Sequence, residues 1–174
     1  IPNIPGASAD NYVQFEPLNG NLGSVIFATS QNSTNPSTRP LMDLRSTHHI
    51  RFYRITFSAT YDNNIAYPVR MGISSLGCQF HECNITEGAS TQGNLANNTR
   101  ATALRYSGGA DSLVVVATNF SRGAIGISMV GPAADNLAHG AVIRKCTFND
   151  QATNYIVVRN HVSAIVDSNT MLNL

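Results

Sequence analysis

One pattern of inward- and outward-facing positions recurs five times between residues 50 and 171. Each copy has two triplets, inward–outward–inward, on either side of a pair of turn residues. Because side chains alternate across a strand, the first and third residues of a triplet share one face. Each copy therefore predicts two short strands joined at a two-residue corner. The copies are Ile50–Phe57, Cys78–Ile85, Leu113–Phe120, Ala141–Phe148 and Ala164–Met171.

A third short strand precedes each copy, and the copies start 28, 35, 28 and 23 residues apart. Units repeated at such distances stack and bury a face that no single unit could bury alone. The pattern therefore predicts a β-solenoid whose rungs each contain three short strands. The preceding strands are Met42–Leu44, Val69–Ile73, Thr102–Tyr106, Ile125–Met129 and Ile156–Val158.

This rung resembles that of the right-handed parallel β-helix, the fold of pectate lyases, polygalacturonases and phage tailspikes. The resemblance covers roughly residues 24–174. We therefore expect an all-β protein, a single-stranded right-handed parallel β-helix of about six rungs of three short strands. Residues 1–23 are expected to form an N-terminal arm or cap, in which Tyr12–Phe15 is either a first, irregular rung or a cap.

The outward position in the middle of the second strand changes character along the chain. It is polar at Arg51 and Gln79 and aliphatic at Val114, Val142 and Ile165. A contiguous exposed apolar stripe usually marks an interface, although a loop of the same chain could also cover it. Because tailspike-like β-helices associate side by side as trimers, the resemblance implies a threefold contact at these three aliphatic residues.

The C-terminal copy runs directly into Leu172–Leu174, with no polar cap or amphipathic helix after it. An open rung end invites pairing with more chain or with another subunit. We therefore expect either that the native chain continues or that another protomer covers this end.

Candidate catalytic residues gather in the connections between first and second strands. Stacking of the rungs could bring them onto one edge, where a His–Asp pair could act as a general base. The alternative is that they are solvated turn residues, since the connections differ in length from 5 to about 11 residues. The candidates are His48, His49, Asp111, Asp135 and His139.

Three arginines, Arg45, Arg105 and Arg159, lie near the ends of the first strands on the same side. Guanidinium groups bind carboxylates through paired hydrogen bonds, so a file of arginines could hold an acidic glycan. A solvated surface is again the alternative.

Enzymatic activity has less support from the sequence. Glycoside hydrolysis generally needs two carboxylates facing each other at ~5–9 Å. The chain has ten acidic residues, thinly spread, and the outward Asp43 is followed on the next rung by Arg70. The aspartate clusters of pectate lyase-like and polygalacturonase-like enzymes have no counterpart here.

Composition restricts the choice of partner. Charged residues make up 12% of the chain and the net charge is +1, which argues against nucleic acid or an anionic membrane as the main partner. Cys78, Cys83 and Cys146 occupy inward positions and are expected to be buried free thiols. We expect no metal and no cofactor. The outward file of the third strand is polar and is either solvated surface or a sugar-binding surface: Thr56, Asn84, Asn119, Thr147 and Thr170.

Two functional hypotheses follow. The first is a virion-type structural protein, a phage spike or a capsid-surface decoration, that forms a homotrimer, contacts other virion proteins and attaches to a cell-surface polysaccharide. The second is an extracellular polysaccharide lyase or glycoside hydrolase, or a fragment of a depolymerising tailspike. Both place the chain on a virion surface or outside the cell.

Overall fold

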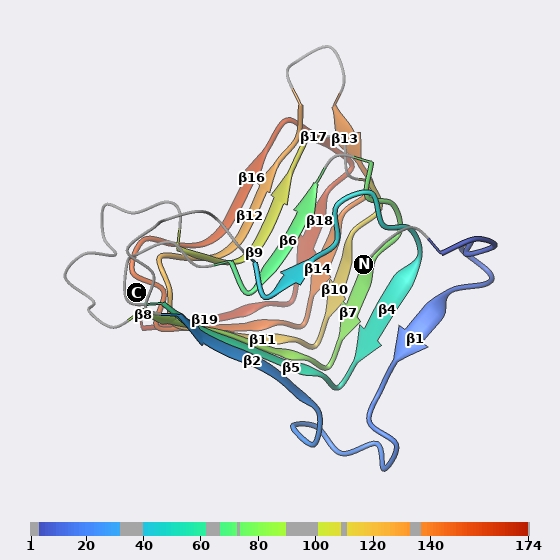
Figure 1. Ribbon diagram of the computed structural model, residues 1–174. Coiled ribbons are helices and arrows are strands. Elements are labelled where there is room, and N and C mark those ends of the chain that lie inside the picture. Colours follow the sequence, from blue (N-terminus) through green and yellow to red (C-terminus); the bar gives the residue numbers. More distant parts are fainter. Residues whose placement is uncertain are drawn as a thin grey trace.

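The chain forms a right-handed parallel β-helix of triangular cross-section in the computed structural model (Figure 1). The structure describes residues 4–31, 40–61, 67–72, 74–89, 101–108, 111–132 and 137–173. Each rung passes through three parallel sheets, which we call C, A and B in chain order. Followed through these sheets in Figure 1, the chain turns clockwise as it recedes from the viewer, which is the right-handed sense. The predicted fold class is confirmed.

Sheets A and B each contain six strands, one from each of six rungs. The strands of sheet A are β1 (Val13–Phe15), β4 (Ile50–Tyr53), β7 (Gln79–His81), β10 (Val114–Val116), β14 (Val142–Arg144) and β18 (Ile165–Asp167). Those of sheet B are β2 (Ile26–Gln31), β5 (Thr56–Tyr61), β8 (Asn84–Ala89), β11 (Asn119–Ser121), β15 (Thr147–Asn149) and β19 (Thr170–Leu172).

Sheet C has five strands, and a small two-stranded sheet lies at the corner between sheets C and A (Figure 1). The strands of sheet C are β3 (Met42–Asp43), β6 (Val69–Gly72), β9 (Thr102–Ser107), β12 (Ile125–Val130) and β16 (Asn154–Arg159). The small sheet pairs β13 (Ala138–His139) with β17 (His161–Val162). Among the residues described, none forms a helix long and apolar enough to cross a membrane.

The two-residue corner between sheets A and B has the same conformation in five rungs. Its second residue is left-handed every time, although none of these residues is glycine. The corner N–H groups still join the ladder: Arg54 N–H donates to His81 O at 3.0 Å, and Glu82 N–H donates to Val116 O at 3.0 Å. Stacking thus offsets the cost of the left-handed backbone. These residues are Arg54, Glu82, Ala117, Lys145 and Ser168, with φ between 49° and 57°.

The core is a set of inward files that run along the helix axis. Phe15, Phe52 and Phe80 stack from rung to rung with ring centroids 5.4 and 5.3 Å apart. The three cysteines are buried and free, as predicted. Burial raises the pKa of each of their thiols to about 11.

The N-terminal segment contributes to the helix itself. β1 pairs in register with β4, and β2 pairs with β5. Of the two alternatives for Tyr12–Phe15, the pairing supports a first rung, so part of the segment expected to be an arm or cap is the first strand of sheet A.

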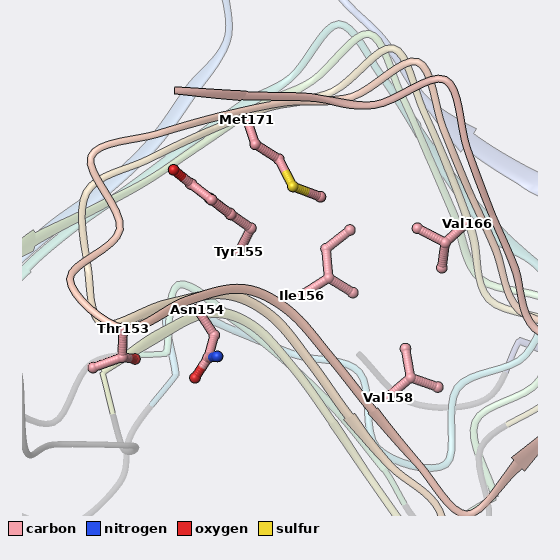
Figure 2. A pocket seen from close by; sticks show the side chains of 7 residues that line it. All are labelled: Thr153, Asn154, Tyr155, Ile156, Val158, Val166 and Met171. Carbon is pink, nitrogen blue, oxygen red and sulfur yellow. The ribbon is translucent and has the colours of Figure 1, made fainter. Parts of the chain in front are cut away.

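The last rung presents core-type side chains to solvent. Val158, Val166 and Met171 are 38–46% exposed, whereas Ile143 and Phe148 of the preceding rung are fully buried. Figure 2 shows these side chains, with Tyr155 and Ile156, pointing into a hollow of about 450 Å³ at this end of the helix. A further rung stacked here would cover them.

Candidate functional site

Arginine dominates the outer face of sheet C. Two files of outward residues contain the charged side chains of this sheet, and each alternates along its strand with buried residues such as Val69 and Met71. Four arginines and one aspartate are the charged residues that the described part of the chain places on this face. The first file is Asp43, Arg70, Arg105, Ser128 and Val157; Gly72, Ser107, Val130 and Arg159 form the second, which Arg45 precedes.

The three predicted arginines therefore do not form a single file. Arg105 lies in the first file next to Arg70, whereas Arg159 lies in the second. The sequence analysis noted Arg70 only as the successor of Asp43 and missed its place beside Arg105. What the arginines share is a face of the helix.

Asp43 neutralises part of this charge. It accepts a 2.9 Å hydrogen bond from Arg45 and a 2.6 Å hydrogen bond from Arg70. Burial would raise the pKa of this carboxyl, but the bonds from the two arginines outweigh burial and lower it to about 2. Asp43 is therefore ionised at neutral pH and is unsuited to act as a general acid.

Arg105 is held in place by Tyr67, which is 2% exposed. The guanidinium lies over the Tyr67 ring, 4.7 Å from its centroid, and donates a hydrogen bond to the phenol oxygen. Stacking and hydrogen bonding together restrict the rotamers of a long side chain, so less entropy is lost when it binds an anion.

A surface groove of about 300 Å³ brings Arg105 and Arg159 to one site. Its lining also includes Ser107, Ser128 and residues with aliphatic side chains such as Val157. Among the described residues, no carboxylate belongs to the lining, which also includes Tyr106, Ile125, Val130 and Asn154. Paired guanidinium groups with hydroxyl and apolar neighbours suit a sugar-sized anion, and the groove lacks the carboxylate pair of a glycosidase.

The predicted catalytic residues that the structure describes lie at the corner between sheets C and A. His48 and Asp111 form bridges to the two sides of Leu76, so Leu76 separates them. Asp111 and His139 lie on adjacent rungs, where Ser112 N–H donates to His139 O at 2.9 Å. Asp111 Oδ1 accepts a 2.7 Å hydrogen bond from the backbone N–H of His139, not from its imidazole ring.

The other candidates at this corner have structural contacts or cannot be placed. His48 Nε2 lies 2.8 Å from Ser74 O. His49 is left-handed, with φ of 51°, and its N–H donates to Leu76 O at 2.8 Å. Asp135 lies outside the described residues. The structure thus places Asp111 beside His139, without a hydrogen bond between their two side chains.

Sequence reasoning missed the proximity of His161 and Tyr106 at this same corner. Their ring centroids are 5.2 Å apart, and neither His161 nitrogen nor the Tyr106 hydroxyl has a hydrogen-bond partner among the described residues. Burial lowers the pKa of His161, and Asp111 partly opposes this shift. Burial raises the pKa of Tyr106, and Asp111 raises it further. The two rings come from different rungs, and no local pattern signals their contact.

The stripe on sheet A has the register that the repeat predicts, with Val114 opposite Val142 and Val142 opposite Ile165. Ile165 is 46% exposed. The N-terminal half of this face is polar: Arg51 lies over the Tyr12 ring, 3.7 Å from its centroid, and donates to Gln79 at 3.0 Å. The apolar part is therefore confined to the last three rungs.

The outer face of sheet B carries two polar files rather than one. In the file predicted from the sequence, Asn119 Nδ2 donates to Asn84 Oδ1 at 3.0 Å. In the second file, the hydroxyl groups of Thr86 and Ser121 lie 2.9 Å apart. These groups hydrogen-bond to one another along the helix, as expected of a solvated surface.

Among the residues described, no group of three or more His, Cys, Asp or Glu side chains could hold a metal ion. Comparison with known proteins adds no assignment, because no protein-family model, curated protein or solved structure matches this chain.

Proposed function

We propose that this protein is a β-helical structural protein of virion type, a spike or capsid-surface decoration that attaches to an acidic cell-surface polysaccharide through the outer face of sheet C. The observation that carries the binding part of this proposal is the groove between Arg105 and Arg159. The virion assignment rests on the resemblance of the rung to that of tailspikes.

The electrostatics of sheet C support an anionic ligand. Arg45 and Arg70 share the single carboxylate of Asp43, so the positive charge on this face exceeds the negative charge. Arg105 bonds to the neutral Tyr67, so its charge is available to a ligand. A uronic acid or sulfated sugar supplies the matching anion, and its hydroxyl groups suit Ser107 and Ser128.

Binding of polygalacturonate oligosaccharides, measured by calorimetry at low salt, tests the proposal. We expect Arg105→Ala to weaken binding by roughly ten- to a hundredfold, as for loss of a charge-assisted hydrogen bond of about 1.5–3 kcal/mol. Arg144→Ala, which removes a half-exposed arginine from sheet A, is the matched control and should bind normally. Equal affinity of the wild type and Arg105→Ala would refute this site, and equal binding of a neutral glucan would refute the acidic ligand.

In this proposal the protein is a homotrimer, and Val114, Val142 and Ile165 meet near the threefold axis. The apolar register of these residues over three rungs supports such a contact. Other virion proteins are further partners of the assembly.

An extracellular polysaccharide lyase or glycoside hydrolase is the second candidate, favoured by the adjacency of Asp111 and His139. For an enzyme, we expect His139→Ala to abolish release of unsaturated or reducing ends from acidic polysaccharides, with its circular dichroism unchanged. His81→Ala, on sheet A, is the control. Release that is undetectable in the wild type, or equal in both variants, would remove this candidate.

A further inference from the structure

Glu87 is a carboxyl group buried inside the β-helix. It lies on β8 in register with Ala59 of β5, an inward position, and is 1% exposed. Glutamate is almost never fully buried unless it is paired. Among the described residues, neither of its carboxyl oxygens has a hydrogen-bond partner.

The carboxyl packs against the corner between sheets B and C one rung further along the helix. A Cβ atom added to Gly123 would collide with Glu87 Oε2, so the carboxyl occupies the space that a side chain at position 123 would need. From the following rung, Gln151 reaches the same corner, where its Nε2 donates to Arg122 O at 3.1 Å. Gln151 is 1% exposed, and its Oε1 also has no donor in the part of the chain that the structure describes.

Among the described residues, no charged group forms a hydrogen bond with Glu87 that would compensate its ionised form. The charged residues that the structure describes at the two corners are Arg122 and Asp150, and neither forms a hydrogen bond or ion pair with Glu87. The part of β5 beside it contributes Ala59 and Thr60, which are neutral. An isolated buried carboxylate is costly, whereas a neutral carboxylic acid can also donate a hydrogen bond to an acceptor such as an amide oxygen.

We propose that Glu87 keeps its proton in the folded protein at neutral pH, so that the corner between sheets B and C packs around a neutral carboxylic acid and is weakened when this acid ionises. This inference is independent of the proposed glycan binding. It makes the stability of the β-helix sensitive to pH near neutrality.

The direction of the effect follows from the pKa. Burial raises the pKa of Glu87 from its ordinary 4.5 to about 8. The stabilisation is therefore full below pH 4.5 and is lost as pH rises to about 8. His161 and His81 act in the opposite direction, because burial lowers their pKa values below the ordinary 6.5. Their contribution destabilises the folded protein as pH falls, whereas that of Glu87 destabilises it as pH rises. Because the unfolded histidines are still partly protonated near pH 6.5, the difference between the wild type and a Glu87→Gln variant isolates the contribution of Glu87.

Urea unfolding between pH 6.5 and 8 tests the proposal. For the wild type, we expect the unfolding equilibrium constant to rise roughly tenfold over this range. Glu87→Gln, a neutral substitute of the same shape, should remove the rise. Glu82→Gln is the control, because Glu82 lies at an exposed corner where its hydrogen bond to Arg54 lowers its pKa, and this variant should keep the rise. The proposal would be overturned if the unfolding equilibrium constant of the wild type did not rise over this range, or if that of Glu87→Gln rose as well.

Infrared spectroscopy of the wild type gives a second test, which holds even if Glu87→Gln fails to fold. A protonated carboxylic acid has a C=O stretch distinct from that of a carboxylate. We expect one such band at pH 7 and its loss as pH rises to 9. A spectrum without this band at pH 7 would contradict the proposal.

Discussion

The inward and outward files of sheet A share one backbone and one register, but the polarity of their residues differs along the helix axis. The inward file is apolar on all six rungs, whereas the outward file one residue away changes from polar to aliphatic. The inward file is Phe15, Phe52, Phe80, Val115, Ile143 and Val166; the outward file is Gln14, Arg51, Gln79, Val114, Val142 and Ile165.

The difference shows where the fold is specified and where a function can be placed. An inward side chain must fit its neighbours ~4.8 Å above and below, so the packing restricts every rung. An outward side chain contacts solvent or a partner, so a substitution at an outward position leaves the stacking of the rungs intact. The arginines of sheet C and the stripe of sheet A both occupy outward files.

The largest expected effect comes from breaking the inward file. Phe80→Ala removes a fully buried ring that stacks on Phe52 and should lower the free energy of unfolding by about 3–5 kcal/mol. Gln79→Ala, on the outward file of the same strand, should cost about 1 kcal/mol or less, through loss of its bond from Arg51. Urea unfolding measures both, and similar costs for the two would contradict the contrast.

A smaller effect is expected at the corner that holds Glu87. Gly123 has φ of 85°, so Gly123→Ala combines backbone strain with a collision and should cost about 2 kcal/mol or more. Because the collision is with Glu87, adding Glu87→Ala should recover part of this cost. A double-mutant cycle measures the coupling, and strictly additive costs would show that the two residues do not share the space.

The smallest effect on stability is expected on the outward stripe. Val142→Asp should leave the unfolding transition within about 0.5 kcal/mol of the wild type, because the side chain lies outside the core. It should nonetheless dissociate the proposed trimer, because an unpaired charge would be buried at the contact. Light scattering coupled to gel filtration measures the mass, against a wild-type trimer near three times 18.7 kDa. A wild-type monomer, or an unchanged oligomer in the variant, would refute the contact.

Sequence reasoning was accurate where a local pattern carries the information. The triplets, corners and buried cysteines lie where the two-residue period of a strand places them. The same period would have placed Glu87 inward, two residues after Ile85, but β8 continues beyond the triplet, and a charged residue there was not recognised as part of the core.

The candidate site was predictable only in part. The arginines were rightly associated with the first strands, but their division between two files was not foreseen. The contact between Tyr106 and His161 was also missed. Both the division of the arginines and the contact between the two rings depend on how connections of unequal length bring the next strand into register. The sequences of these connections have no regular pattern.

The sequence by itself thus determined a β-solenoid of three-strand rungs, because a short repeat with a strand period has one face to bury and stacking is the way to bury it. Tertiary structure decided which outward residues become neighbours. Arg105 and Arg159 share a groove, and Glu87 fills the space beside Gly123, because the stacking of whole rungs sets the distance between residues far apart in the chain.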